Sequence, residues 1–195
     1  MHKIKNKLFF ILALLMAFVV VLSNYLVQFP IEYFGLENLL TYGALSYPVA
    51  FLITDLSNRR YGKKVAKKIV GIGFLSGVFL TFYFSKIYSD LIPTRIAIGS
   101  GTAFLIAQLI DVHVFDILRK KIWFMAPLIS SLVGSTIDTF LFFSISFYGT
   151  GINWVTLSMG DLLVKIFVAL LMLVPFRFLL HYIKDISDSK KKISV

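Results

Sequence analysis

The sequence predicts an all-α, polytopic membrane protein in which residues 1–195 form a single domain, a six-helix transmembrane bundle. Hydrophobic residues make up 58% of the chain and charged residues only 15%, against about 25% charged residues in a soluble domain. Six stretches are apolar over the ~20 residues that a helix needs to cross a bilayer. Most lysines and arginines lie between these stretches, as they do in polytopic proteins.

The six apolar stretches define the expected helices. They cover residues 8–29, 39–57, 69–85, 96–118, 122–148 and 161–182. Each is expected to be helical because backbone N–H and C=O groups in lipid must find partners within their own segment. The chain has no cysteine, which excludes disulfides, thiolate metal sites and cysteine nucleophiles. It also lacks HExxH, GxSxG, GxGxxG and Walker sequences, so we expect neither an enzyme nor a bound cofactor or metal.

The basic residues predict the orientation of the chain. Of the 20 lysines and arginines, 17 fall in the first seven residues, in 59–68, in 119–121 and from Arg177 onward, which are all on one side of the membrane if six helices alternate. Lys86 and Arg95 fall on the opposite side, and Lys165 lies within the last stretch. The positive-inside rule then places both termini in the cytoplasm, in a bacterial cytoplasmic (inner) membrane. Because the charges lie in loops, the net charge of +10 indicates attraction to anionic lipid headgroups rather than to nucleic acid.

Ionisable side chains within the apolar stretches are candidate functional residues. A charged group near the centre of a bilayer costs about 2.5 to 3.5 kcal/mol on insertion scales, so it is retained for a reason. Asp138 is the strongest single candidate, because it lies deep in its helix, far from either water phase. The ionisable residues in question are Asp55, Asp111, His113, Asp138, Asp161 and Lys165.

Helical spacing groups some of these residues with amides. Asn24 and Gln28 lie four residues apart, and Gln108 and Asp111 lie three apart, so each pair shares one helix face that is expected to point into the bundle. Asn24 and Gln28 also suit simple hydrogen bonding between helices. His113 lies about 200° around the helix from Asp111, which argues against a joint proton relay and favours a packing role.

Two charged pairs leave a structural alternative open. Asp55 and Arg59 are four residues apart, and the alternative to a functional role is an interfacial ion pair that ends the helix. Asp161 and Lys165 have the same spacing, and their alternative is a structural pair at the start of a helix. At that position Asp161 would also act as a cap favoured by the helix dipole.

Short motifs in five of the six stretches show a family likeness. They are SNYLVQ at 23–28, YP at 47–48, TDL at 54–56, QLIDVHVF at 108–115, DT at 138–139, and Asp161 with Lys165 and Pro175. In these motifs the chain closely resembles the queuosine precursor transporter family, also called the YhhQ-like or VUT family. The resemblance covers nearly the whole chain, although the 69–85 stretch contributes little to it.

The resemblance implies import of 7-deazaguanine precursors, 7-cyano-7-deazaguanine or 7-aminomethyl-7-deazaguanine, for salvage into queuosine-modified tRNA. A guanine-like base presents adjacent N–H donors on one edge, and an ionised carboxylate offers two acceptor oxygens to match them. Asp138 or Asp111 is expected to accept these donors. Asn24, Gln28 and Gln108 are expected to take the remaining hydrogen-bonding groups.

Lys165 and several aromatic residues complete the expected substrate site. Lys165 is expected to face the carbonyl oxygen of the base, or to neutralise a carboxylate when the site is empty. Aromatic faces favour a flat ring by about 1 to 3 kcal/mol per stacked base, and Tyr25, Phe51, Phe104 and Phe142 lie at suitable helical levels.

The energy source is left open by the sequence. A proton-coupled carrier would use one of the buried aspartates as its titrating group. The alternative is a substrate-binding subunit of an energy-coupling-factor transporter, which docks on separate ATPases, and the small residues Ala13 and Ala17 have the spacing for such a contact. A non-transporting membrane scaffold would leave the buried charges unexplained.

Overall fold

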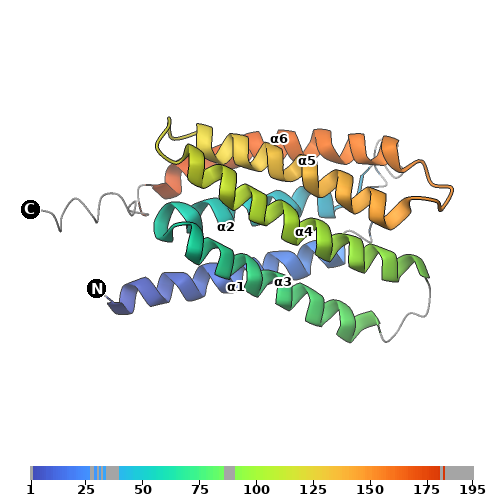
Figure 1. The fold of residues 1–195 in the computed structure, drawn as a ribbon, viewed down its shortest axis with the longest axis horizontal. Helices are drawn as coiled ribbons and strands as arrows, with labels where there is room; N and C mark the ends of the chain where they lie inside the picture. The colour runs from blue at the N-terminus through green and yellow to red at the C-terminus, as the bar shows by residue number, and fades with distance from the viewer. Residues whose placement is uncertain are drawn as a thin grey trace, which may run out of the picture.

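Six α-helices pack side by side in the computed structural model, which describes residues 2–26, 29, 31, 33, 40–85, 91–180 and 182. Figure 1 shows the helices running back and forth along one long axis. The all-helical prediction is confirmed for the described residues. The helix bounds are α1 His2–Leu26, α2 Gly43–Tyr61, α3 Lys63–Ser85, α4 Leu91–Leu118, α5 Met125–Phe147 and α6 Trp154–Leu180.

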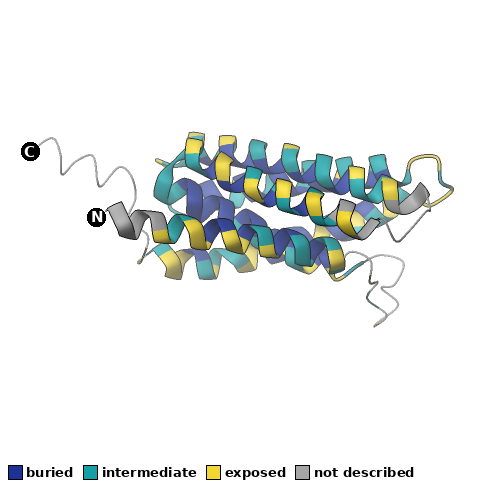
Figure 2. Ribbon diagram, turned by 90° about the horizontal axis from the view of Figure 1, so that it is seen from below, coloured by how far each residue is buried: buried dark blue, intermediate teal, exposed yellow. Residues whose placement is uncertain are grey.

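Four of these helices are long and apolar enough to cross a membrane. They are α1 from Lys7, α4 from Thr94, α5 and α6. Figure 2 shows exposed residues along the outer faces of the helices and buried residues between them. Many of the exposed residues are large and apolar, among them Leu14, Phe79, Leu163 and Phe167, as expected of surfaces that face lipid tails.

Helix α2 occupies the centre of the bundle and contacts each of the other five helices. It is not among the four helices that meet the composition of a membrane span. Four polar residues lie close together on this helix, and all of them are buried: Thr54, Asp55, Ser57 and Asn58. The neighbouring helices shield α2 from lipid, so its polar side chains find partners within the protein instead of facing hydrocarbon.

The basic segments gather at one end of the bundle. Figure 1 places the start of α1, the α2–α3 junction, the α4–α5 loop and the end of α6 together. We call this the basic end, because it carries Arg59, Arg60 and Lys63 at the α2–α3 junction and Arg119 to Lys121 in the α4–α5 loop. We call the opposite end, which carries the α5–α6 loop, the far end.

The basic segment between α2 and α3 is helical, which corrects the expected bounds of 39–57 and 69–85. Helix α2 continues to Tyr61 and α3 begins at Lys63, so Gly62 alone separates them. Gly62 has φ 83°, a left-handed value that favours glycine. Lysine and arginine are good helix formers, and their long side chains keep the charges at the surface while the backbone stays helical.

Helix α6 begins at Trp154, well before the expected residue 161. The backbone N–H of Thr156 donates to the Asn153 side-chain oxygen at 3.4 Å, which caps the first turn. Asp161 therefore lies about two turns inside the helix, and the expectation that it caps the helix start was wrong. Helices α1 and α4 also begin earlier than expected, at His2 and Leu91, whereas α5 is slightly shorter than 122–148.

A polar contact fastens α2 to α4 at the basic end. The Asn58 side-chain amide donates to the Val112 carbonyl at 2.9 Å, and the Arg119 guanidinium donates to both the backbone and side-chain oxygens of Asn58. Arg59 in turn donates to the Arg119 carbonyl at 2.8 Å. Asn58 is fully buried, so its hydrogen bonds replace water that it cannot reach.

Replacing Arg119 by glutamine is expected to destabilise the protein by about 1–3 kcal/mol, because buried Asn58 oxygens then lose a charged donor. The measurement is the melting temperature of the purified protein in detergent. Lys120→Gln is the matched control, because Lys120 is the next basic residue and is exposed. Equal melting temperatures for the two variants would show that this contact adds nothing to stability.

Candidate functional site

A cavity of about 210 Å³ opens between α2, α4, α5 and α6 toward the far end. We call it the far-end cavity. Near the far end, the cavity is lined by Thr41, Ile96, Phe147 and Leu157. Its inner end is formed by residues that lie further along the same helices, and these are polar: Tyr47, Ser100, Asp138, Asp161 and Lys165.

Lys165 joins α5 to α6 at the inner end of this cavity. Its ammonium lies 2.9 Å from Asp138 Oδ2 and 2.6 Å from Asp161 Oδ2, and it donates to Thr139 Oγ1 at 3.1 Å. Thr139 donates its own hydroxyl proton to Asp161 Oδ2 at 2.8 Å. A lysine ammonium has three donors, and these three contacts use all of them. We call these four residues the Lys165 cluster.

The Lys165 cluster contains two carboxylates and one ammonium, all of them buried. A buried ion pair is stable when its geometry is good and its remaining polar groups are hydrogen-bonded, and Thr139 supplies part of that bonding. The Lys165 nitrogen also lies 5.4 Å from the centre of the Tyr47 ring, a cation–π distance. Asp161 and Lys165 form the predicted pair, and Asp138 shares the same ammonium.

Hydroxyl groups extend the polar surface from the cavity to α1. The Tyr47 hydroxyl lies 2.9 Å from Ser100 Oγ, and both groups donate to Asn24 Oδ1, at 3.4 Å and 2.8 Å. Asn24 therefore holds α2 and α4 at the inner end of the cavity. The prediction that Asn24 faces the bundle interior is confirmed by these contacts, which fit both the substrate role and the structural alternative.

Aromatic rings from α5 line one wall of the far-end cavity. They are Phe142, Phe143 and Phe147, and the rings of Phe143 and Phe147 lie 5.8 Å apart at a shallow angle of 36°. Of the four aromatic residues expected at the site, only Phe142 lines this cavity among the described residues. Tyr25 is largely exposed and Phe104 packs against Tyr47, whereas Phe51 lines a second pocket.

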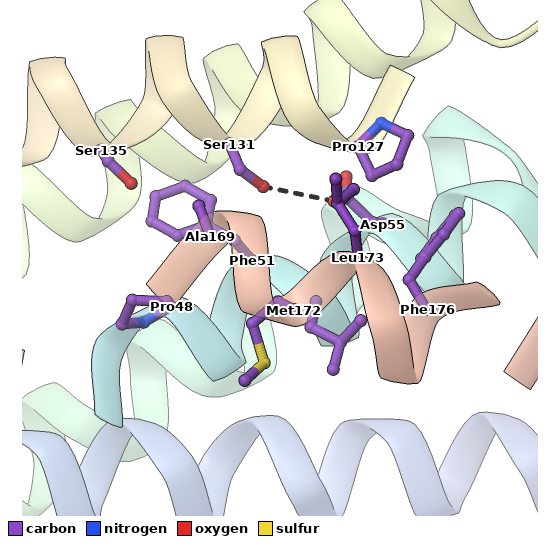
Figure 3. Close-up of a pocket in the computed structure, with 11 residues that line it drawn as sticks. Pro48, Phe51, Asp55, Pro127, Ser131, Ser135, Ala169, Met172, Leu173 and Phe176 are labelled. Carbon is purple, nitrogen blue, oxygen red and sulfur yellow. Dashed lines mark hydrogen bonds between the residues drawn. The ribbon is translucent and has the colours of Figure 1, made fainter. Parts of the chain in front are cut away.

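The second pocket lies between α2, α5 and α6, closer to the basic end. Figure 3 shows Asp55 of α2 facing Ser131 of α5, with Phe51 and Phe176 among the residues around them. Asp55 accepts hydrogen bonds from Ser130 at 3.1 Å and from Ser131 at 3.3 Å. The volume of about 10 Å³ is roughly that of one water-sized probe. We call this the carboxylate pocket.

Asp111 and Gln108 of α4 lie in the same layer as Asp55. Both are fully buried, which confirms that they share an inward face. Gln108 Oε1 accepts from Thr54 Oγ1 at 2.5 Å, and Asp111 packs against α5 beside Gly134. The structure thus divides the predicted residues into a far-end group and a basic-end group about two to three helical turns apart.

Two predicted residues, His113 and Arg59, lie outside both groups, and a third falls outside the part of the chain that the structure describes. His113 is exposed on α4 and its Nδ1 lies 2.5 Å from Lys63 Nζ, so it points away from Asp111, as its spacing predicted. Arg59 contacts the α4 end at Arg119. Gln28 lies outside the described residues.

Several contact residues were not among the candidates. Tyr47 and Ser100 face the far-end cavity, Thr139 completes the Lys165 cluster, and Ser130 donates to Asp55. Hydroxyl residues are common in membrane helices, so composition did not distinguish them. The signal was their spacing: Ser131, Ser135 and Asp138 follow one stripe of α5, and Thr139 lies next to that stripe.

The far-end cavity has the chemistry to bind a small, flat, polar molecule. Asp138 offers an acceptor, Lys165 offers a positive charge, Tyr47 and Ser100 offer hydroxyls, and the α5 rings offer an apolar face. A few polar groups on an otherwise apolar lining are typical of ligand sites. These groups lie on four helices, α2, α4, α5 and α6.

Comparison with known proteins identifies the family. Residues 41–180 match the family model described as "Putative vitamin uptake transporter". The chain is 35% identical to the "Probable queuosine precursor transporter" of Haemophilus influenzae, over 81% of this chain and 80% of that protein. The chain belongs to the queuosine precursor transporter family. As a member of that family it is a transporter and not an enzyme.

Two further relatives support the same assignment. The "Queuosine precursor transporter" of Escherichia coli is 31% identical over 88% of this chain and 85% of its own length. The relative from Bacillus subtilis is 30% identical over 83% of this chain and 79% of its own length. No solved structure matches the chain. The matched range of the family model contains the Lys165 cluster and the carboxylate pocket, so both belong to the part of the chain that defines the family.

Proposed function

We propose that this protein imports a queuosine precursor, 7-cyano-7-deazaguanine or 7-aminomethyl-7-deazaguanine, across the bacterial cytoplasmic membrane. The named relatives support the substrate class. The concentration of lysine and arginine at the basic end supports an orientation with that end in the cytoplasm. The far-end cavity then opens to the outside, where the precursor is taken up.

The observation that carries the proposal is the buried Lys165 cluster at the inner end of the far-end cavity. The guanine-like edge of the precursor presents neighbouring N–H donors and a carbonyl oxygen. A carboxylate accepts such donors, and the positive charge of an ammonium attracts the carbonyl oxygen. Asp138 and Lys165 present this pair of groups from adjacent helices, with Asp138 Oδ2 engaged by Lys165. In this proposal Asp138 Oδ1 accepts from the precursor.

The rest of the cavity suits the remainder of a bicyclic base. The ring system finds apolar and aromatic surface on Phe142, Phe143 and Phe147. Bases stack favourably on aromatic side chains of this kind. Tyr47 and Ser100 supply hydroxyls for the polar atoms that remain. The substituent at the seven-position of the base is expected to point toward the open, far end of the cavity.

The test is the level of queuosine in tRNA of cells that neither synthesise the precursor nor import it themselves. Cells that express this gene and receive nanomolar precursor are expected to regain the modification. Asp138→Asn, which keeps the size of the side chain but removes the charge, is expected to lower the initial rate of recovery at least tenfold. Asp116→Asn is the matched control, because Asp116 is a partly exposed aspartate near the basic end.

Two results would contradict the proposal. If the wild-type protein is present in the membrane and no modification returns, this precursor is not its substrate. If Asp138→Asn restores the modification at the wild-type rate, the substrate does not bind through Asp138. A protonophore added while cellular ATP is held constant separates coupling to an ion gradient from dependence on an ATPase partner. The ATPase alternative was expected to use Ala13 and Ala17 as a docking contact, and Ala13 is buried in the core of the bundle.

A further inference from the structure

Asp55 and Asp111 lie in the same layer of the bundle, closer to the basic end than the far-end cavity. Their exposed fractions are 1% and 0%, so neither carboxylate reaches bulk water. Asp55 of α2 accepts hydrogen bonds from the hydroxyls of Ser130 and Ser131 of α5, and Asp111 of α4 packs against α5 beside Gly134. The two carboxylates therefore lie against the same stretch of α5, at the contact of α2, α4 and α5.

Several buried polar atoms in this layer lack a hydrogen-bond partner among the described residues. They include both carboxylate oxygens of Asp111, the Gln108 side-chain nitrogen and the Ser135 hydroxyl. Buried polar groups are nearly always satisfied by protein, water or a ligand. Ser135 and Asp55 line the same carboxylate pocket. The Ser135 hydroxyl is thus available in the pocket beside Asp55, and the unsatisfied atoms of Asp111 and Gln108 belong to α4 in the same layer.

The charged side chains around this layer contact groups other than Asp55 and Asp111. On α6, Lys165 is held by Asp138 and Asp161, and Arg177 lies over the Trp123 ring at 4.8 Å. On α2, Arg59 donates to the Arg119 carbonyl, and on α4 the exposed His113 meets Lys63 of α3. From α5 the facing groups are the hydroxyls of Ser130 and Ser131. Two ionised carboxylates in this position would repel one another without compensation.

The size of the pocket indicates which species balances this charge. About 10 Å³ is room for one water-sized group, which is too little for a hydrated metal ion. A proton needs no such room, because it forms an O–H bond on one carboxylate and is shared with an acceptor on the other. The serine hydroxyls can rotate to follow its position, since each can donate or accept.

We propose that Asp55 and Asp111 together bind one proton, at a site separate from the substrate cavity, and that this proton is the coupling ion for import. The inference rests on the proposed function. In the cycle the pair gains one proton from the outer side and releases it to the cytoplasm, so one positive charge moves inward with each neutral substrate. The Lys165 cluster belongs to the far-end cavity, so substrate binding and coupling use different residues.

The connection between the two sites runs along α5. Ser131 contacts Asp55, Gly134 packs on Phe51 with Asp111 beside it, and Asp138 contacts Lys165. These three positions fall on one side of the helix over about two turns. A shift of α5 that admits a proton to the Asp55–Asp111 pair therefore moves one wall of the substrate cavity as well.

The experiment uses the purified protein in proteoliposomes with radiolabelled 7-cyano-7-deazaguanine, the uncharged precursor. An inward proton gradient is expected to drive accumulation at least tenfold above equilibration, whereas a sodium gradient of equal size is expected to have no effect. Asp55→Asn and Asp111→Asn are expected to lose this accumulation. They are also expected to retain precursor binding and exchange of internal for external precursor, because the far-end cavity is intact. Asp116→Asn is the matched control and should behave as the wild type.

Three outcomes would overturn the proton site. Accumulation driven by the sodium gradient would assign the pair to sodium, and gradient-driven accumulation in both Asn variants would assign coupling to other residues. If the variants do not fold, infrared spectra of the wild type decide the matter, because a shared proton gives a carboxylic acid C=O band that shifts in D₂O. Absence of that band across the pH range of transport would exclude the site. Failure of the wild type to bind any deazaguanine would instead overturn the proposed function.

Discussion

Replacing Lys165 by methionine is expected to abolish transport and to destabilise the protein by about 3–5 kcal/mol, the usual cost of removing one partner from a buried ion pair. Methionine keeps most of the length of the side chain but supplies no donor. Asp138, Asp161 and Thr139 would each lose the ammonium that contacts them. The two carboxylates would then remain buried without a countercharge. The measurements are precursor uptake and the melting temperature in detergent.

A double variant separates the two roles of Lys165. Lys165→Met combined with Asp138→Asn removes one positive and one negative charge together, so it is expected to recover part of the lost stability while uptake stays absent. Lys121→Met is the control, because Lys121 is exposed in the α4–α5 loop. Recovery of uptake in the double variant would show that the ion pair serves folding alone, and normal stability of Lys165→Met would refute the structural role.

Replacing Gly134 by alanine is expected to block transport through a single methyl group. A Cβ atom built at Gly134 would lie 2.5 Å from a ring carbon of Phe51 and 3.3 Å from Asp111 Cβ. Phe51 is 2% exposed, so its ring has little space to retreat. Overpacking of this kind costs about 1–3 kcal/mol, and the displaced ring would separate α5 from α2 between the two polar sites. Uptake and melting temperature should both fall.

A compensating change tests whether the Phe51 ring causes this effect. Phe51→Leu shortens the side chain, so Gly134→Ala combined with Phe51→Leu is expected to melt at a higher temperature than Gly134→Ala alone and to regain part of its uptake. Gly71→Ala on α3 is the control, because nothing lies within 4 Å of the Cβ position there. If the double variant is no better than Gly134→Ala, the contact with Asp111 is responsible instead.

The sequence by itself determined the class of this protein and most of its important residues. Apolar stretches long enough for a bilayer led to six helices, because hydrophobic patterning depends on local composition alone. The cost of burying a charge drew attention to Asp55, Asp111, Asp138, Asp161 and Lys165, and the structure buries all five. Family motifs indicated the transporter class, which the comparisons confirmed.

Helix ends were the weaker part of the sequence prediction. The basic residues at 63–68 were expected in a loop, and they begin α3, because a lysine-rich segment forms a helix as readily as an apolar one. The start of α6 depended on the side chain of Asn153, a local contact that hydropathy does not register. Moving that start by seven residues turned Asp161 from an expected cap into an interior residue of the Lys165 cluster.

Only the tertiary structure decided which buried residues act together. Helical spacing relates residues within one helix, and it carries no information on which helices are neighbours. Packing brought Lys165 of α6 to Asp138 of α5, brought Ser130 of α5 to Asp55 of α2, and separated these two sites by the Phe51–Gly134 contact. It also placed the polar helix α2 at the centre of the bundle, where contact with five helices satisfies side chains that lipid could not.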